Sequence, residues 1–139
     1  MPDRTIATYE AALAEAADAQ AALALSKLRL FDSTLVPDVS TTKVDMAAAE
    51  TLLTGYPAGG YTLTAFTDPQ LAPGGGAVIT SPAVPVNYAS GDAAAIGGGW
   101  VETAGGDVWR VFIFDPPITL AVVGDGFIFI RQLLFGRNA

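Results

Sequence analysis

The sequence predicts a mainly β fold, an antiparallel β-sandwich or jelly-roll-like domain with an N-terminal α-helix and one short helix. Seven or eight short runs of β-branched and aromatic residues, separated by Gly, Pro and Asp, follow a single Ala-rich segment. The strongest runs lie in VWRVFIFDPPITLAVVGDGFIFIRQLLF, residues 108–135, where large side chains point to both faces of the predicted strands. A sheet with two apolar faces must be covered twice, by a second layer of the chain and by a helix, a loop or another subunit.

An N-terminal helix is predicted over residues 6–25. The segment is rich in Ala, and basic residues follow its end, where the helix dipole favours them. Spacings of three and four residues predict one contacting side, formed by Ile6, Tyr9, Leu13, Ala16 or Ala17, Gln20 and Leu23. Residues 1–26 are therefore either part of the same domain or an assembly arm, and residues 27–139 form the β-sandwich domain.

The following segments predict a strand, a short helix and a second strand. Residues 27–32, KLRLFD, place Leu28 and Leu30 on one face of a strand and Phe31 on the other. Thr41 or Thr42 caps a short helix over residues 44–53, and Gly55 marks its C-terminal stop. Residues 61–66 alternate as in a strand with one wetter face.

Residues 67–99 are rich in Pro, Gly, Ser and Ala. Short strands are predicted over residues 77–80 and 84–88, where Pro82 and Pro85 indicate a position at a sheet edge. The loops at 73–76 and 97–99 are expected to be mobile or shaped by a partner. A further strand over residues 100–103 is expected to end at the Gly105–Gly106–Asp107 turn.

Residues 108–135 predict three strands, at 108–114, 118–123 and 127–134, with Asp115-Pro116-Pro117 between the first two. Gly124-Asp125-Gly126 predicts that the last two strands form a hairpin. The last strand has two apolar faces, with Phe127, Phe129 and Leu133 on one and Ile128, Ile130 and Leu134 on the other.

The composition excludes several kinds of catalytic site. The 139 residues contain no Cys and no His, which excludes thiolate nucleophiles, Ser-His-Asp triads and His-ligated zinc. The glycine runs at 74–76 and 97–99 are not followed by Lys-Ser/Thr or by a helix, so they do not fit a phosphate-binding loop. Four acids lie near strand ends, but turn and cap roles explain them more simply than a catalytic pair: Glu102, Asp107, Asp115 and Asp125. We expect no enzyme activity, no metal and no cofactor.

The charge and the hydrophobic content of the chain limit the kinds of partner that it can bind. The chain has 7 Lys and Arg against 14 Asp and Glu, a net charge of −7, so nucleic acid would be repelled. Although 51% of the residues are hydrophobic, no uninterrupted apolar span reaches the roughly 20 residues of a membrane helix. Glu10, Glu15 and Asp18 occupy the place where a secretory signal needs an apolar core, which predicts a protein that is not secreted.

Seven side chains are candidates for an interface. Two Arg lie within apolar strands, where each should pair with an acid such as Glu102 or Asp115 or reach an interface. For the two Trp, core packing is favoured over stacking on a sugar or a partner. The candidates are Ile6, Tyr9, Leu13, Trp100, Trp109, Arg110 and Arg131.

Several short motifs follow one another along the chain. KLRLF at 27–31 follows the first helix, Gly55-Tyr56 follows a short acidic helical segment, and GWVE at 99–102 precedes the closing VWRVFIFDPPITLAVVGDGFIF with its late Gly-Asp turn. In this order the chain resembles small virion proteins encoded among the structural genes of tailed bacteriophages. The resemblance implies a small β-sandwich that decorates a head or sits on a fibre or tail in several copies, and it implies no catalytic residues.

The expected function is therefore that of a non-enzymatic virion protein, a capsid decoration or cement protein. It would be made in the host cytoplasm, associate as a homotrimer through its apolar strands, and bind the major capsid protein or another virion protein. One alternative is a head-fibre or tail-tip domain that binds a host glycan through Trp100, Tyr61 or Tyr88. A third is a carbohydrate hydrolase, which needs two acids about 5 to 10 Å apart in one cleft.

Overall fold

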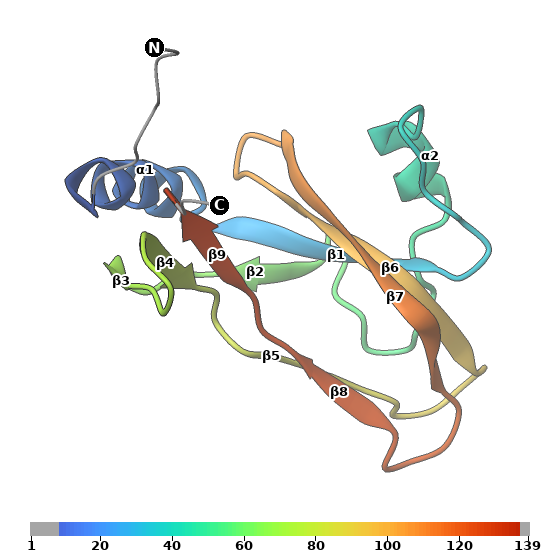
Figure 1. Cartoon of the computed structure of the whole chain (residues 1–139). Coiled ribbons are helices and arrows are strands. Elements are labelled where there is room, and N and C mark those ends of the chain that lie inside the picture. The colour runs from blue at the N-terminus through green and yellow to red at the C-terminus, as the bar shows by residue number, and fades with distance from the viewer. Residues whose placement is uncertain (1–8, 137–139) are drawn as a thin grey trace.

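The computed structural model describes residues 9–136, and the predicted mainly β fold with antiparallel sheets, an N-terminal helix and one short helix is confirmed (Figure 1). The elements in chain order are α1 (Tyr9–Ala22), β1 (Ser26–Asp32), α2 (Lys43–Ala48), β2 (Tyr61–Leu63), β3 (Gln70–Leu71), β4 (Ala77–Thr80), β5 (Val84–Asn87), β6 (Ala94–Glu102), β7 (Val108–Leu120), β8 (Gly126–Phe129) and β9 (Gln132–Phe135). The described residues thus form nine strands, where the sequence predicted seven or eight.

A four-stranded antiparallel sheet in the order β2-β1-β6-β7 forms one layer. The prediction for KLRLFD is confirmed, because Leu28 and Leu30 are buried in the main core while Phe31 is buried in a separate cluster with Trp100 and Met46. The two clusters lie on the two faces of this sheet, since side chains alternate along β1.

The second layer is a long two-stranded ribbon. β4 pairs with β9 and β5 pairs with β8, so that residues 77–87 run antiparallel to residues 126–135. Between the two ladders, the Ser81 amide donates to the Arg131 carbonyl and the Arg131 amide donates to the Ser81 hydroxyl, both at 2.8 Å. We call residues 77–87 together with 126–135 the ribbon.

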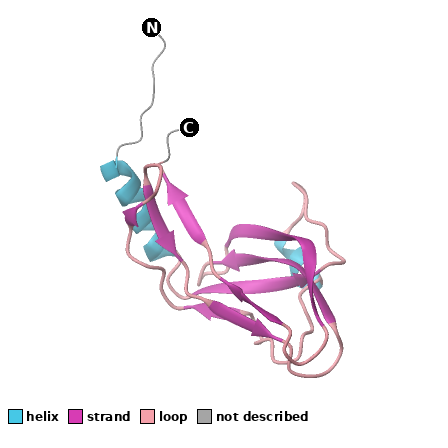
Figure 2. Ribbon diagram, turned by 60° about the horizontal axis from the view of Figure 1, so that its bottom comes forward, coloured by secondary structure: helices cyan, strands magenta, loops and turns pink. Residues whose placement is uncertain are grey.

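The ribbon is covered on its inner side by two different elements. At one end, the rings of Phe127 and Phe129 meet those of Phe114 and Phe112 of β7 edge to face, with centroids 5.7 and 5.4 Å apart. At the other end, α1 packs against β4 and β9 (Figure 2). The four-stranded sheet and α1 therefore both pack on the inner side of the ribbon, which gives a sandwich-like arrangement.

The other face of the four-stranded sheet is covered by α2. Thr42 caps this helix as predicted, since its hydroxyl accepts from the Asp45 amide while the Asp45 carboxylate accepts from the Thr42 amide. Met46 of α2 packs on Phe31 and Trp100. The helix ends at Ala48, earlier than predicted, and the chain then pairs briefly with β1 through Glu50.

The contacting side of α1 agrees with the prediction at Ala16 and Leu23 but not at its larger residues. Its buried residues are Ala12, Ala16 and Ala19, followed by Leu23 just beyond the helix. Tyr9 is 42% exposed and Leu13 is half-buried. The small Ala side chains let the helix approach the ribbon closely, and the larger residues flank that contact. Ile6 lies outside the described residues.

The loop predicted at residues 97–99 is instead the buried centre of β6, paired with β1 on one side and β7 on the other. A Cβ on Gly98 would collide with the Phe112 carbonyl and would lie 2.6 Å from Cζ of Phe31. These positions are thus glycine because the neighbouring strands leave no room for a side chain, and not because the segment is a mobile loop.

Three predictions for residues 108–135 need correction. The single strand predicted at 127–134 is two strands, β8 and β9, separated by Ile130 and Arg131. Residues 108–120 form the single strand β7, in which residues 114–117, with the Asp115-Pro116-Pro117 interruption, bulge out opposite Gly97. The predicted hairpin is wrong, because β7 pairs with β6 whereas β8 pairs with β5. The turn around Asp125 therefore carries the chain from the sheet to the ribbon.

Candidate interaction surfaces

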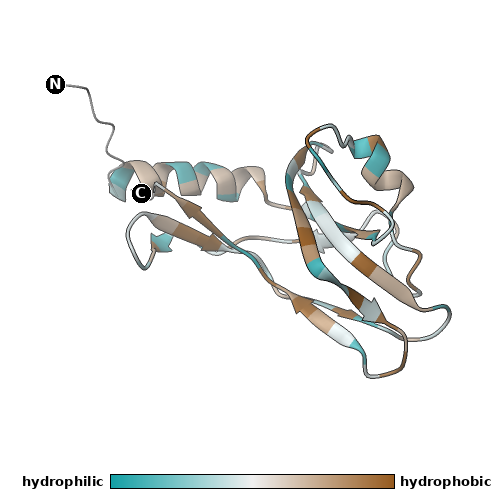
Figure 3. Cartoon of the chain, turned by 45° about the vertical axis from the view of Figure 1, so that its right-hand side comes forward, coloured by the Kyte–Doolittle hydropathy of each residue, from teal (hydrophilic) through white to brown (hydrophobic). Residues whose placement is uncertain are grey.

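The outward side of the ribbon is an exposed aliphatic surface. The prediction of two apolar faces is confirmed, since Phe129 is buried while Ile128, Ile130 and Leu134 are 67, 53 and 45% exposed. Cross-strand partners on the same side are Pro85, opposite Ile128, and Val78, opposite Leu134. We call the surface of Val78, Pro85, Ile128, Ile130 and Leu134 the ribbon face. Figure 3 shows that the strands of the ribbon consist largely of hydrophobic residues, drawn in brown.

The ribbon face carries no ionisable side chain. The remaining outward residues of the paired strands are Thr80, Asn87 and Gln132, which are polar but uncharged. Large exposed apolar patches on soluble chains usually mark binding surfaces, because their exposure to water is unfavourable.

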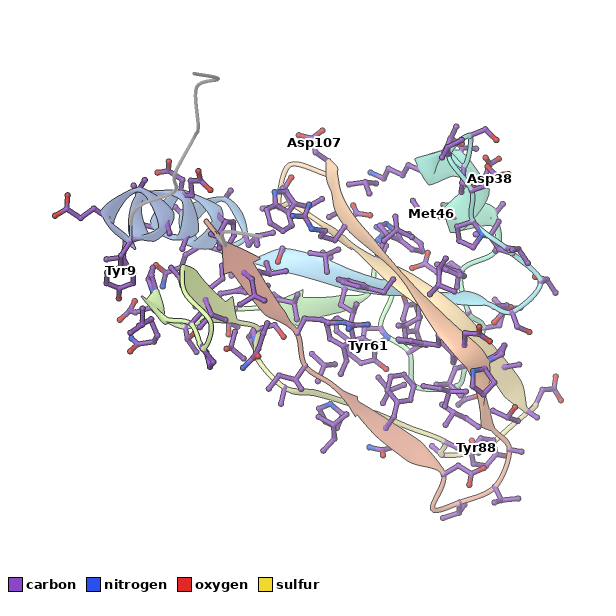
Figure 4. The ribbon with its side chains drawn as sticks, viewed as in Figure 1. Tyr9, Asp38, Met46, Tyr61, Tyr88 and Asp107 are labelled. Carbon is purple, nitrogen blue, oxygen red and sulfur yellow. The ribbon has the colours of Figure 1, made fainter. Side chains whose placement is uncertain are left out.

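A second apolar surface lies on the α2 side of β7. Val111 and Ile113 are 41 and 57% exposed there, and the loop after β1 presents Pro37 and a fully exposed Val39. Between them is an open groove of 320 Å³, which we call the β7 groove and which is lined by Pro37, Asp38, Val39, Thr41, Met46, Val111 and Ile113. Figure 4 labels Asp38 and Met46 on this side of the molecule.

Among residues 9–136, Asp38 is the one charged residue that lines the β7 groove. Its carboxylate accepts from the Ser40 amide at 2.8 Å and the Ser40 hydroxyl at 2.7 Å, and these hydrogen bonds lower the pKa of Asp38. The carboxylate therefore fixes the conformation of the loop that forms one wall of the groove.

β7 is also an edge strand. Over the part of the chain that the structure describes, β6 pairs with one side of β7 and no strand pairs with the other. Such an edge combines unpaired backbone groups with the aliphatic side chains of Val111 and Ile113, a combination that favours association.

A cluster of charged residues lies beside the second core cluster. Glu102 accepts from the Trp100 indole at 2.8 Å and pairs with Arg29 at 3.0 Å and with Lys43 at 3.4 Å. Arg29 also pairs with Glu50 at 3.3 Å. These contacts give both carboxylates a structural role, which is to join β1, β6, α2 and the segment after α2.

Tyr56 extends this cluster. Its hydroxyl donates to Glu50 at 2.6 Å and accepts from the Leu30 amide at 3.2 Å. Burial, followed by the hydrogen bond to Glu50, raises the pKa of Tyr56 well above its usual range. The phenol thus remains a hydrogen-bond donor above the pH at which a free tyrosine ionises.

The other acids considered as a catalytic pair occupy turns and a bulge. The Asp125 carboxylate accepts from the amides of Ala121 and Val122, which lowers its pKa. The backbone carbonyl of Asp107 closes the β6–β7 turn by accepting from the Thr103 amide. Asp115 lies in the bulge of β7.

The predicted interface residues are placed in different environments. Trp100 is fully buried, as core packing predicted, so its side chain is not part of the surface. Trp109 is half-buried, and the guanidinium of Arg110 lies over its ring, 4.0 Å from the ring centroid. Arg131 lies 4.7 Å from the ring centroid of Phe112. The expected pairing of these two Arg with Glu102 or Asp115 is wrong: each contacts an aromatic ring, and in residues 9–136 neither forms an ion pair.

The aromatic residues considered for glycan binding are also used within the chain. Tyr61 packs edge-on against Tyr56, with ring centroids 5.5 Å apart, and the Tyr88 hydroxyl donates to the Gly91 carbonyl at 2.7 Å. Figure 4 shows Tyr61 and Tyr88 on different parts of the molecule.

Sequence reasoning missed the β7 groove. Its loop wall comes from STLVPDVS, residues 33–40, where aliphatic side chains stand among turn-forming residues. Aliphatic residues within a polar turn are the signal that indicates an exposed contact. The second wall depends on β7 being an edge strand, which only the sheet order reveals.

Neither a metal-binding cluster nor a helix able to cross a membrane occurs within residues 9–136. Comparisons with models of protein families, with curated proteins and with solved structures found no match to the chain.

Proposed function

We propose that the protein is a non-enzymatic structural component of a bacteriophage virion, a capsid decoration or cement protein that forms a homotrimer and binds the assembled head. The observation that carries this proposal is the ribbon face, an uncharged aliphatic surface on a chain with a net charge of −7. Acidic copies repel one another wherever charged surfaces meet, so association is least costly through an uncharged surface.

Association would also stabilise the folded chain. Burial of apolar surface contributes about 25 cal/mol per Å². An interface that forms only between folded copies shifts the folding equilibrium by mass action. A particle component that must survive internal pressure benefits from both effects.

The phage assignment rests on the resemblance in motif order. KLRLF and Gly55-Tyr56 lie early in that order, and the late Gly-Asp turn lies near its end. In the proposed mechanism a trimer spans the joints between neighbouring capsid subunits and adds buried area across them.

The first test is the mass of the purified protein by light scattering. We expect three times the chain mass of 14.3 kDa. A single chain at every concentration would contradict the proposed self-association.

The second test uses particles. Heads purified from a phage genome that carries the gene should contain the protein by mass spectrometry, and heads from a genome that lacks it should break at a lower temperature. Equal robustness would contradict a cement role. Binding to host envelope polysaccharide, without binding to heads, would instead favour the head-fibre or tail-tip alternative.

A further inference from the structure

The chain presents two apolar surfaces that cannot cover each other. The ribbon face is on the side of the ribbon that points away from the four-stranded sheet, whereas the β7 groove is on the side of that sheet that points away from the ribbon. Figures 1 and 3 show the sheet between the ribbon and α2. Within residues 9–136, no other part of the chain covers either surface.

Both surfaces carry little charge. The ribbon face has no ionisable residue, and among the described residues the groove is lined by one, Asp38, an ionised carboxylate that accepts two hydrogen bonds from Ser40. With a net charge of −7 on every copy, these are the regions at which two copies meet with least repulsion.

The two surfaces also differ in shape. Along one strand of the ribbon, Ile128 and Ile130 alternate with inward residues and so stand in a row on the outer side. The β7 groove is hollow and is walled by Val39 on one side and by Val111 and Ile113 on the other. A projecting aliphatic row is a shape that an aliphatic groove can receive.

We propose that the β7 groove of one copy receives the ribbon face of the next copy in a head-to-tail contact. This inference rests on the self-association in the proposed function and names its two surfaces. A contact between two ribbon faces, or between two grooves, would leave the other surface exposed, whereas a head-to-tail contact buries both. Contacts of this kind close into a ring, such as the proposed trimer, only if each copy is rotated enough relative to the next; otherwise they continue as an open chain.

Site-specific crosslinking tests the contact, because the chain has no native Cys. Val39→Cys places a thiol beside the groove and Ile128→Cys places one on the ribbon face, both at exposed positions where folding does not depend on the side chain. With a short bis-maleimide, we expect a crosslinked dimer when the two variants are mixed and none when either is treated alone.

Leu52→Cys is the matched control, an exposed aliphatic position that belongs to neither surface. It should give no crosslink with either variant. Crosslinking of Ile128→Cys with itself, or of Val39→Cys with itself, would overturn the head-to-tail arrangement. So would the absence of any crosslinked dimer from an oligomeric protein.

Substitutions that introduce a charge test the head-to-tail contact independently. Ile113→Asp disrupts only the groove and Ile130→Asp only the ribbon face, and each should reduce the oligomer to single chains with an unchanged circular dichroism spectrum. If one variant keeps its mass, its surface is not part of the contact and the inference fails, while the proposed self-association stands. If the unsubstituted protein is itself a single chain, both fail.

Discussion

Glu102 joins three elements of the molecule through one carboxylate, and its side chain is only 6% exposed. It holds the indole of Trp100 within β6, the guanidinium of Arg29 on β1, and the ammonium of Lys43 at the start of α2. Lys43 in turn donates to the Gly106 carbonyl in the β6–β7 turn at 2.6 Å. The position of α2 over the sheet therefore depends on this residue.

Removing that carboxylate should be costly. We expect Glu102→Ala to lower the free energy of unfolding by about 2 to 4 kcal/mol, because the indole loses its acceptor and the guanidinium of Arg29 loses one of its two carboxylate partners in a partly buried site. Urea unfolding followed by Trp fluorescence measures the change. Glu15→Ala on the exposed side of α1 is the control and should change stability by less than about 0.5 kcal/mol.

Asp125 makes the stability depend on pH. Its pKa is lowered in the folded state by the amides of Ala121 and Val122, so its contribution is full above the unfolded pKa of about 3.9 and is lost as pH falls through the folded pKa. We expect the stability difference between the unsubstituted protein and Asp125→Asn to be largest near pH 6 and to shrink below pH 4. A constant difference across urea unfolding curves at pH 3, 4.5 and 6 would contradict this origin.

At the scale of elements, the glycines of β6 determine how closely the four-stranded sheet packs. We expect Gly98→Ala to destabilise the fold by about 1 to 3 kcal/mol, since the added methyl meets the Phe112 carbonyl and the Phe31 ring. Gly105→Ala is the matched control, because its Cβ would meet only the Thr103 hydroxyl at an ordinary 3.8 Å. Thermal melts of both variants provide the comparison, and equal melting temperatures would refute the packing role.

The burial of these glycines could not be predicted from the sequence. Alternation of apolar residues predicted β1 and both faces of the last strands, because those patterns are set by local geometry. Gly98 has no side chain from which to infer burial, and its neighbours Phe31 and Phe112 are brought to it only by pairing of distant strands. The pairing of β8 with β5 instead of β7 likewise depends on contacts between distant parts of the chain, so the expected hairpin was wrong.

Of the two candidate surfaces, the ribbon face could be predicted from the sequence and the β7 groove could not. The exposed side of Ile128, Ile130 and Leu134 follows from alternation, and a need for a second cover was expected from it. The groove beside Val39 and Ile113 was not expected, because it joins a loop to a strand more than 70 residues away. Trp100 was weighed as an interface residue, but its indole is used by Glu102 within the core.

The whole molecule is acidic, and this determines how its association should respond to salt. Copies that meet through uncharged surfaces gain when their mutual repulsion is screened, since the Debye length falls from about 14 Å at 0.05 M salt to about 4 Å at 0.5 M. We expect the oligomer to persist to lower protein concentration at the higher salt, measured by sedimentation velocity. Weaker association at high salt would indicate an interface held by ion pairs.

The pairing of residues 77–87 with 126–135 also governs the order of events during synthesis. When α1 and β1 leave the ribosome, the strands that cover them do not yet exist: β1 awaits β6, and the inner face of α1 awaits β4 and β9. The ribbon closes only after residues 126–135 have been made, so the core assembles late and from contacts distant in sequence, the kind that form slowly. Until then Leu28, Leu30 and Phe31 remain exposed, and a nascent chain of this topology is a natural client for a chaperone.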